Sequence, residues 1–243
     1  MRALLTRTIK RVLRSADIDL TRWSQSPEAT VLGLTHRQIL TILDIGANSG
    51  QFAGFVSKRF PSAQIYCFEP LPKPFAKLNE WIKKRQTNIS AFNCALGDSE
   101  GVLPMYEHVD HDYSSSFLRA TDLSRTYYPE SRRETTTLVR TLRLDDAVRE
   151  FNIELKPEVL VKMDVQGFEA HVIKGGRRTL QQSTACLLEI ALDELYSEQA
   201  TFSELLQLLE SLGFKYAGNF QQSKAEDGHV RFVDALFVMR NIA

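Results

Sequence analysis

The stretch TILDIGANSG, residues 41–50, decides the fold of this 243-residue chain. Its first part is a short apolar run that ends at Gly46 and Ala47, and residues 51–60 then carry apolar side chains at helical spacing. Because glycine permits a tight turn between the two patterns, the stretch predicts a strand, a sharp turn and a helix. The apolar stripe of this helix consists of Phe52, Phe55, Val56 and Phe60.

Outward from this stretch, apolar runs of strand length alternate with segments of helical period. This alternation requires helices on both faces of a mostly parallel sheet. The last two extended runs have too few residues between them for a crossover helix, so we expect them to pair antiparallel. The predicted fold class is α/β, a mostly parallel seven-stranded sheet with an antiparallel last strand. Its strands are expected at 41–47, 64–68, 89–96, 159–165, 184–192, 214–217 and 232–239, and its later helices at 72–85, before 175–176 and at 202–212.

One domain with an N-terminal extension accounts for the chain, since no repeat or long linker divides it. We place a helical extension at residues 1–35 and the main domain at 36–243. Two extended segments, 102–106 and 137–142, flank a polar stretch at about 107–136, which we interpret as an insertion.

The N-terminal extension carries an apolar stripe with basic residues around it. Two interpretations fit this pattern. The helix packs on the domain or on a second subunit of a homo-oligomer, which we favour, or it makes peripheral contact with an anionic membrane surface. The stripe consists of Leu5, Ile9, Val12 and Leu13, and the basic residues are Arg2, Arg7, Lys10, Arg11 and Arg14.

The composition, 43% hydrophobic and 25% charged, is that of an ordinary globular domain. Thirty Lys and Arg residues balance 30 Asp and Glu residues, so no global positive field points to a nucleic-acid partner. No apolar run approaches the roughly 20 residues of a transmembrane helix, and the N-terminus lacks a secretory signal pattern. We therefore expect a cytoplasmic protein. Cys67, Cys94 and Cys186 lie in strand-like runs without C-x-x-C spacing, which predicts reduced core residues.

A glycine loop and a later acid predict a nucleoside site. Gly46 and Gly50 follow the first strand at the edge where doubly wound sheets bind ligands. Glu69 ends the second strand, where a carboxylate can accept ribose hydroxyl protons. A dinucleotide loop usually reads G-x-G-x-x-G, but Asn48 takes the place of its middle glycine. An NAD(P)-dependent oxidoreductase therefore remains only as a weaker alternative.

A second motif, KMDVQGFEAHVIKG at residues 162–175, begins where another strand ends, at the same edge of the sheet. Together with the loop D-x-G-x-N-x-G, it resembles the K-x-D-x-E/Q-G-x-E-x-x-V-L-x-G signature of the FkbM family of methyltransferases. The resemblance runs from residue 42 to residue 189. It includes FEP at 68–70, NCALGD at 93–98, three serines at 114–116, TLRLDD at 141–146 and LLE at 187–189.

This resemblance implies a Rossmann-like class I methyltransferase fold with S-adenosyl-L-methionine as cofactor. It also implies a hydroxyl acceptor, often on a sugar, a glycan or a glycosylated small molecule. Gln166 departs from the glutamate that many relatives carry, which leaves a catalytically inactive S-adenosylmethionine-binding scaffold as a further alternative. The candidate cofactor-binding residues are Asp44, Gly46, Ala47, Asn48, Gly50, Glu69, Pro70, Asn93, Ala95, Asp98, Ser115, Ser116 and Asp164.

Methyl transfer to an alcohol requires alignment of donor and acceptor and a base for the hydroxyl proton. Asp164 is the preferred base or orienting group, and Glu169 and His171 are the other catalytic candidates. An acid in the first turn of a helix, such as Glu169, is also favoured by the helix dipole alone. The run EHVDHDY at 107–113 contains imidazole and carboxylate groups, but we interpret it as a solvated loop and expect no metal site. Candidates to stack on a sugar ring are Tyr113, Tyr127 and Tyr128.

Overall fold

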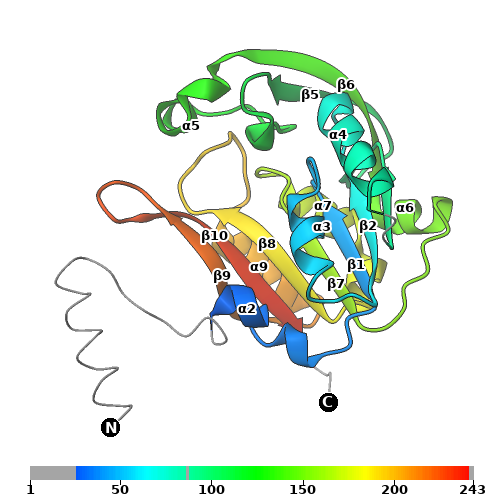
Figure 1. Ribbon diagram of the computed structural model, residues 1–243. Coiled ribbons are helices and arrows are strands. Elements are labelled where there is room, and N and C mark those ends of the chain that lie inside the picture. The colour runs from blue at the N-terminus through cyan, green and yellow to red at the C-terminus, as the bar shows by residue number, and fades with distance from the viewer. Residues whose placement is uncertain (1–25, 86–87, 241–243) are drawn as a thin grey trace, which may run out of the picture.

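The computed structural model describes residues 26–85 and 88–240, which form a seven-stranded sheet with helices on both faces and a smaller sheet beside it (Figure 1). In spatial order, the strands of the large sheet are β3 (Ile89–Phe92), β2 (Gln64–Phe68), β1 (Thr41–Ile45), β7 (Val159–Met163), β8 (Ala185–Ala191), β10 (Val230–Met239) and β9 (Phe214–Lys224).

The strand directions confirm the predicted mostly parallel sheet with an antiparallel last strand. β1 pairs in parallel with β2 and β7, and the parallel set continues to β3 and β8. β10 runs antiparallel to both β8 and β9. β9 reaches Lys224, well beyond the expected end at residue 217, and its pairing with β10 contains bulges. The second half of β9 is rich in exposed polar residues, because β9 is an edge strand. It therefore lacks the apolar run from which a strand could be predicted.

The central strands bury side chains on both faces of the sheet, as parallel strands between two helical layers must. In β1, Ile42 packs in the cluster that contains Ala53 of α3, whereas Leu43 packs in the cluster that contains Val172 of α7. The first layer contains α3 (Gln51–Val56) and α4 (Pro72–Lys83). The second contains α6 (Leu144–Glu150), α7 (Glu169–Gly175), α8 (Arg177–Gln181) and α9 (Phe202–Ser211).

The expected third strand, 89–96, is wrong as a single element. β3 ends at Phe92, and the chain then leaves the large sheet to form β4 (Ala95–Gly97) in the smaller one. Asn93 explains the break, because its side-chain amide donates to the carbonyl oxygens of Glu69 and Pro70, each at 2.9 Å. The turn at Asn93 therefore moves the following residues out of register with β2.

The smaller sheet has the order β4-β6-β5, with β5 at Gly101–His108 and β6 at Glu134–Arg143. Residues 109–133 connect β5 to β6 and are here called the roof segment, because they lie above the carboxyl ends of the large sheet's strands in Figure 1. A bridge between Ala120 and Tyr196 connects the roof segment to the loop after β8. The roof segment contains η3 (Asp112–Ser114), α5 (Asp122–Tyr127) and η4 (Pro129–Arg132).

The described chain begins with two short helical turns, α2 (Pro27–Thr30) and η2 (Leu34–His36). The apolar stripe and basic residues of the extension lie outside the described residues. Across 26–85 and 88–240, no helix has the length and apolar character needed to cross a membrane.

Gly46 is expected to be among the least replaceable residues of the fold. It has a φ of +77°, and a Cβ built on it would collide with the main-chain carbonyl oxygen of Asp164. Gly46→Ala should therefore lower the free energy of unfolding by about 1–3 kcal/mol through overpacking and by about 1–2 kcal/mol more through left-handed strain. Gly33 has a φ of +93° with nothing within 4 Å of a built Cβ, so Gly33→Ala isolates the strain. Chemical denaturation measures both, and equal losses would contradict the collision.

Candidate active site

A cavity of about 240 Å³, here called the main cavity, lies at the carboxyl ends of β1, β2, β7 and β8 beneath the roof segment. The carboxyl ends of parallel strands share one edge of the sheet, so residues distant in sequence meet there. Of the candidate cofactor-binding residues, its lining includes Gly46, Asn48, Glu69, Pro70, Ala95, Ser115 and Asp164.

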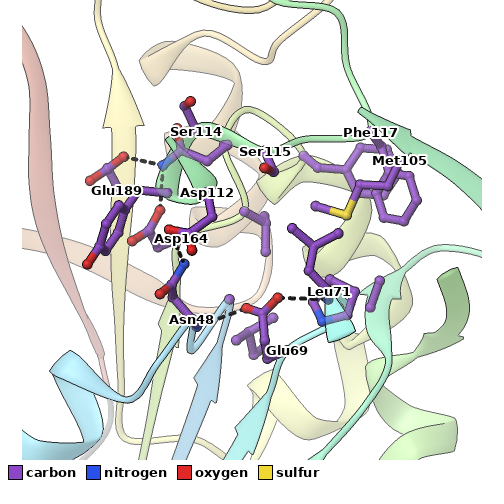
Figure 2. A pocket seen from close by; sticks show the side chains of 18 of the residues that line it. Asn48, Glu69, Leu71, Met105, Asp112, Ser114, Ser115, Phe117, Asp164 and Glu189 are labelled. Carbon is purple, nitrogen blue, oxygen red and sulfur yellow. Dashed lines mark hydrogen bonds between the residues drawn. The ribbon is translucent and has the colours of Figure 1, made fainter. Parts of the chain in front are cut away.

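Glu69 is anchored at the end of β2 by two backbone amides. Its Oε2 accepts the N–H of Asn48 at 2.9 Å, and its Oε1 accepts the N–H of Leu71 at 2.8 Å (Figure 2). Burial raises its pKa to about 7, although these two bonds lower it. A carboxylate offers about four lone-pair positions, so each oxygen keeps acceptor capacity. Glu69 is therefore a fixed acceptor suited to ribose hydroxyls.

The raised pKa of Glu69 predicts a pH-dependent affinity for S-adenosylhomocysteine. Its folded pKa of about 7 exceeds the ordinary 4.5, so the folded protein binds this proton more tightly, and ionisation of Glu69 lowers stability as the pH rises towards 7. The ionised form accepts ribose hydroxyl protons more strongly, because protonation turns one carboxyl oxygen into a donor. The dissociation constant, measured by calorimetry, should therefore fall between pH 6 and 8. A constant affinity across this interval would contradict the assignment.

The two ends of the main cavity differ in polarity. Leu71, Ala95 and Met105 belong to one buried apolar cluster, against which Phe117 packs. Figure 2 shows Met105 and Phe117 at one side of Glu69 and the carboxylates of Asp164 and Glu189 at the other. A flat heterocyclic base suits the apolar end, and polar or charged groups suit the opposite end.

Lys162 connects the strand ends of β1 and β7. Its Nζ lies 3.1 Å from Asp164 Oδ2 and 3.7 Å from Asp44 Oδ1, and it donates to the Gly46 carbonyl oxygen at 3.3 Å. Burial alone would lower the pKa of Lys162, but the charges of Asp164 and Asp44 raise it above its usual range. Asp44, a cofactor-binding candidate, is fully buried and does not line the main cavity. Its carboxylate supports Lys162 instead.

Gln166 joins two carboxyl groups at the polar end. Its Nε2 donates to Asp164 Oδ1 and to Glu189 Oε1, both at 2.7 Å, and its Oε1 accepts the hydroxyl of Tyr196 at 2.7 Å. Burial raises the pKa of Glu189 well above its usual range, and the nearby Asp164 raises it further. An amide can make these contacts because it carries donors and an acceptor, and the departure at position 166 therefore has a structural role.

Glu169 does not line the main cavity. Its Oε1 accepts the N–H groups of Val165 and Gly167, at 3.1 and 3.3 Å, and the side chain is buried at the start of α7. Burial raises its pKa to about 7, which these amide bonds oppose. Glu169 thus holds the loop after β7, and the structure gives it no contact with the cavity as a catalytic base.

Asp98 and His171 form a pair outside the main cavity. The Nδ1 atom of His171 lies 2.7 Å from Asp98 Oδ2, and the imidazole stacks on Phe168 with ring centroids 4.0 Å apart. Neither residue lines the cavity. In the structure this pair connects the turn after β4 to α7.

The other cofactor-binding candidates do not line the main cavity; they hold the backbone of the segments around it. Gly50 has a φ of +93° at the start of α3, where a Cβ would press on Leu78. Asn93 makes the turn after β3 described above, and Ala47 is buried in the layer of α3. Ser116 donates its hydroxyl to the Gln166 carbonyl oxygen at 2.7 Å and so fixes the loop after β7.

The roof segment contributes Ser114, one of the three serines singled out in the sequence, and Asp112, which the sequence interpretation did not place in the cavity. Asp112 Oδ1 accepts the side-chain amide of Asn48 at 3.3 Å, which ties the roof to the glycine loop. Tyr113 and Tyr128, considered as sugar-stacking residues, also line the cavity. The sequence gives no sign that Asp112 contacts Asn48, because the contacts of an insertion depend on how it folds back over the sheet.

The histidines of the 107–113 run contact one serine. Nδ1 of His108 and Nδ1 of His111 lie 2.8 and 2.9 Å from Ser114 Oγ. Within the part of the chain that the structure describes, no group of three or more His, Cys, Asp or Glu side chains could hold a metal ion.

Comparison with known proteins decides the family. The model of the methyltransferase FkbM domain matches residues 44–216. The chain belongs to this FkbM methyltransferase family. It is 33% identical over 190 residues to the 2-O-methyltransferase NoeI of Sinorhizobium fredii, covering 72% of this chain and 76% of that protein. It is 27% identical over 147 residues to the hexuronic acid methyltransferase AglP of Haloferax volcanii, covering 60% and 54%.

The crystal structure of an FkbM methyltransferase from Methylobacillus flagellatus shares the fold, with a TM-score of 0.52 at 13% identity over 83% of this chain and 44% of that one. Membership of the family confirms the prediction of an S-adenosylmethionine-dependent methyltransferase and contradicts the alternative of an NAD(P)-dependent oxidoreductase. The main cavity fits this cofactor, because it combines an anchored carboxylate, an apolar end and a polar end with Asp164.

Proposed function

We propose that this FkbM-family methyltransferase methylates a hydroxyl oxygen of a sugar, a glycan or a glycosylated small molecule. The observation that carries the proposal is Asp164, which sits at the polar end of the main cavity in contact with Lys162 and Gln166. The 2-O-methyltransferase and the hexuronic acid methyltransferase among its relatives support an oxygen acceptor on a sugar-like compound. We also propose a cytoplasmic location, supported by three buried free cysteines.

The residues that would hold S-adenosylmethionine are those of the main cavity. Glu69 would accept ribose hydroxyls, and the apolar wall of Leu71, Met105 and Phe117 would cover the base. The loop from Gly46 to Asn48 would contact the remaining, methionine part. When bound, this cofactor supplies a sulfonium methyl group that transfers to the acceptor oxygen.

Asp164 would orient the acceptor hydroxyl and accept its proton as the new C–O bond forms. Lys162 and Gln166 each bind one of its carboxylate oxygens, at 3.1 and 2.7 Å, and so fix the plane of the carboxylate. Such alignment lowers the entropic cost of bringing the reacting atoms together. Lys162 and Gln166 are therefore positioning residues for Asp164.

A methyl-transfer screen tests the proposal against the inactive-scaffold alternative. The purified protein is incubated with S-adenosylmethionine carrying a labelled methyl group and with a panel of neutral and acidic methyl glycosides. We expect label on a glycoside oxygen, identified by mass spectrometry of the product. Tight binding of S-adenosylhomocysteine without transfer to any glycoside would favour the scaffold.

A further inference from the structure

A second cavity of about 310 Å³, here called the side cavity, adjoins the main cavity. The two cavities share Asp164 and Glu189 as lining residues, along with parts of the glycine loop. The side cavity extends from these acids along the face of the large sheet that α3 covers, towards β9 and β10. A molecule in the side cavity therefore has access to Asp164 from the side opposite Glu69 and the apolar end.

One wall of the side cavity is aromatic. It consists of Phe52 and Phe55 of α3 and Phe220 of β9. The ring centroids of Phe52 and Phe55 lie 6.2 Å apart, and those of Phe55 and Phe220 lie 5.6 Å apart. Phe52 and Phe55 are partly buried, whereas Phe220 is buried. The Arg59 guanidinium carbon lies 3.6 Å from the centroid of the Phe55 ring, so the exposed part of Phe52 is the apolar surface on which the C–H face of a sugar ring can pack.

The opposite wall is a row of polar side chains on three neighbouring strands. Asp234 of β10 is directly paired with Glu189 of β8 on one side and with Gln221 of β9 on the other. Residues directly opposite one another share a face of the sheet, and all three line the side cavity. Within the described residues, the side chains of Asp234 and Gln221 make no hydrogen bond or ion pair with protein groups. They are free to bind vicinal hydroxyls.

The charge of the side cavity selects against anionic ligands. Lys162 is the one cation among its described lining residues, and its ammonium group already contacts Asp164 and Asp44. Burial and the nearby Asp164 together raise the pKa of Asp234 to about 6, although Lys162 lowers it. At neutral pH Asp234 is therefore largely ionised. A uronic acid carboxylate placed in this cavity would meet like charge without an unpaired cation.

We propose that the side cavity is the acceptor subsite and that it binds an uncharged sugar ring, with one hydroxyl presented to Asp164. The aromatic wall carries the ring face, and Asp234 and Gln221 bind hydroxyls that are not methylated. This inference rests on the proposed function and adds to it a choice between neutral and acidic sugars.

The test measures binding to protein saturated with S-adenosylhomocysteine. The probes are methyl glycosides of neutral hexoses and 6-deoxyhexoses, and the methyl glycoside of glucuronic acid, titrated by calorimetry or saturation-transfer NMR. We expect the best neutral glycoside to bind and the glucuronide to bind at least tenfold more weakly. Equal or tighter binding of the glucuronide would overturn the proposal.

Two variants locate the subsite. Asp234→Asn keeps the side-chain shape but removes the charge, and Phe52→Ala removes half-buried stacking surface. Each should raise the dissociation constant of the neutral glycoside up to about tenfold, because Asp234→Asn replaces a charged acceptor by a weaker neutral one and Phe52→Ala removes a ring contact. Each should change S-adenosylhomocysteine affinity less than about twofold. Asp234→Asn should also reduce the difference in affinity between the glucuronide and the neutral glycoside.

The control is Glu226→Gln, an exposed residue between β9 and β10, which should alter neither affinity. Unchanged glycoside affinity in Asp234→Asn, measured on folded protein, would place the acceptor elsewhere and overturn the subsite alone. Failure of every glycoside to bind or to accept a methyl group would overturn the proposed function as well, so the two failures are distinguishable.

Discussion

Asp164→Asn is expected to slow methyl transfer about 10²–10⁴-fold, the usual contribution of a positioned base. The asparagine oxygen can still accept the hydrogen bond from Gln166, which in the wild type donates to Asp164 Oδ1 at 2.7 Å. The variant keeps this bond but cannot take a proton from the acceptor hydroxyl, and its NH₂ group replaces the oxygen that now accepts from Lys162 at 3.1 Å. Single-turnover methyl transfer measures the rate, and calorimetry with S-adenosylhomocysteine measures the cofactor affinity, which should fall far less than the rate.

The matched control for this variant is Asp146→Asn. Asp146 lies on α6, away from both cavities, and pairs with the exposed Arg149. Its replacement should leave the rate of methyl transfer nearly unchanged. A rate loss below about threefold in Asp164→Asn would contradict Asp164 as the group that accepts the proton, because even a weak general base contributes more.

Glu69→Gln should weaken S-adenosylhomocysteine binding by about 10- to 100-fold. The glutamine amide has one oxygen and one NH₂ group, whereas the carboxylate faces two N–H donors, from Asn48 and Leu71. One donor would then meet another donor, and the acceptor for ribose hydroxyls would be lost. Hydrogen bonds to charged groups contribute about 1.5–3 kcal/mol, and each 1.4 kcal/mol is about tenfold in affinity.

Calorimetry on folded protein measures this loss, with Glu80→Gln as control. Glu80 lies on the exposed face of α4, so its replacement should not change the affinity. The pH dependence of binding between pH 6 and 8 should also disappear in Glu69→Gln, because the titrating group is gone. Wild-type affinity in this variant would show that the ribose is held elsewhere.

The order along the chain of the central strands was predictable because each is buried on both faces, and α3, α4, α7 and α9 were expected, whereas the short helices α6 and α8 were not. The end of the third strand was not predictable, since the sequence continues to look extended through Ala95 and Leu96. A single amide, Asn93, redirects the chain by binding two carbonyl oxygens that belong to the loop after β2. Such a turn depends on a tertiary contact that no local pattern reports.

The site was predictable where it is formed by strand ends. Gly46, Glu69 and Asp164 each follow an apolar run at the same edge of the sheet, and the structure brings them to one cavity. An ion pair of Lys162 could have been predicted from the sequence, because a lone cation inside a buried strand requires a buried partner. The place of Asp112 in the cavity could not have been predicted, because it depends on how the roof segment folds over the sheet.

The contact that Gln166 makes with Asp164 and Glu189 restricts how this enzyme can diverge. A glutamate at position 166 would bring a third acidic group against two carboxyl groups that are each 2.7 Å from the present amide nitrogen. A lineage that exchanges the amide for an acid must therefore also acquire a compensating neighbour, such as a bound proton or a new basic side chain. Since the family signature keeps the aspartate at position 164 beside either residue, we expect this compensating change at another side chain that contacts the two carboxyl groups.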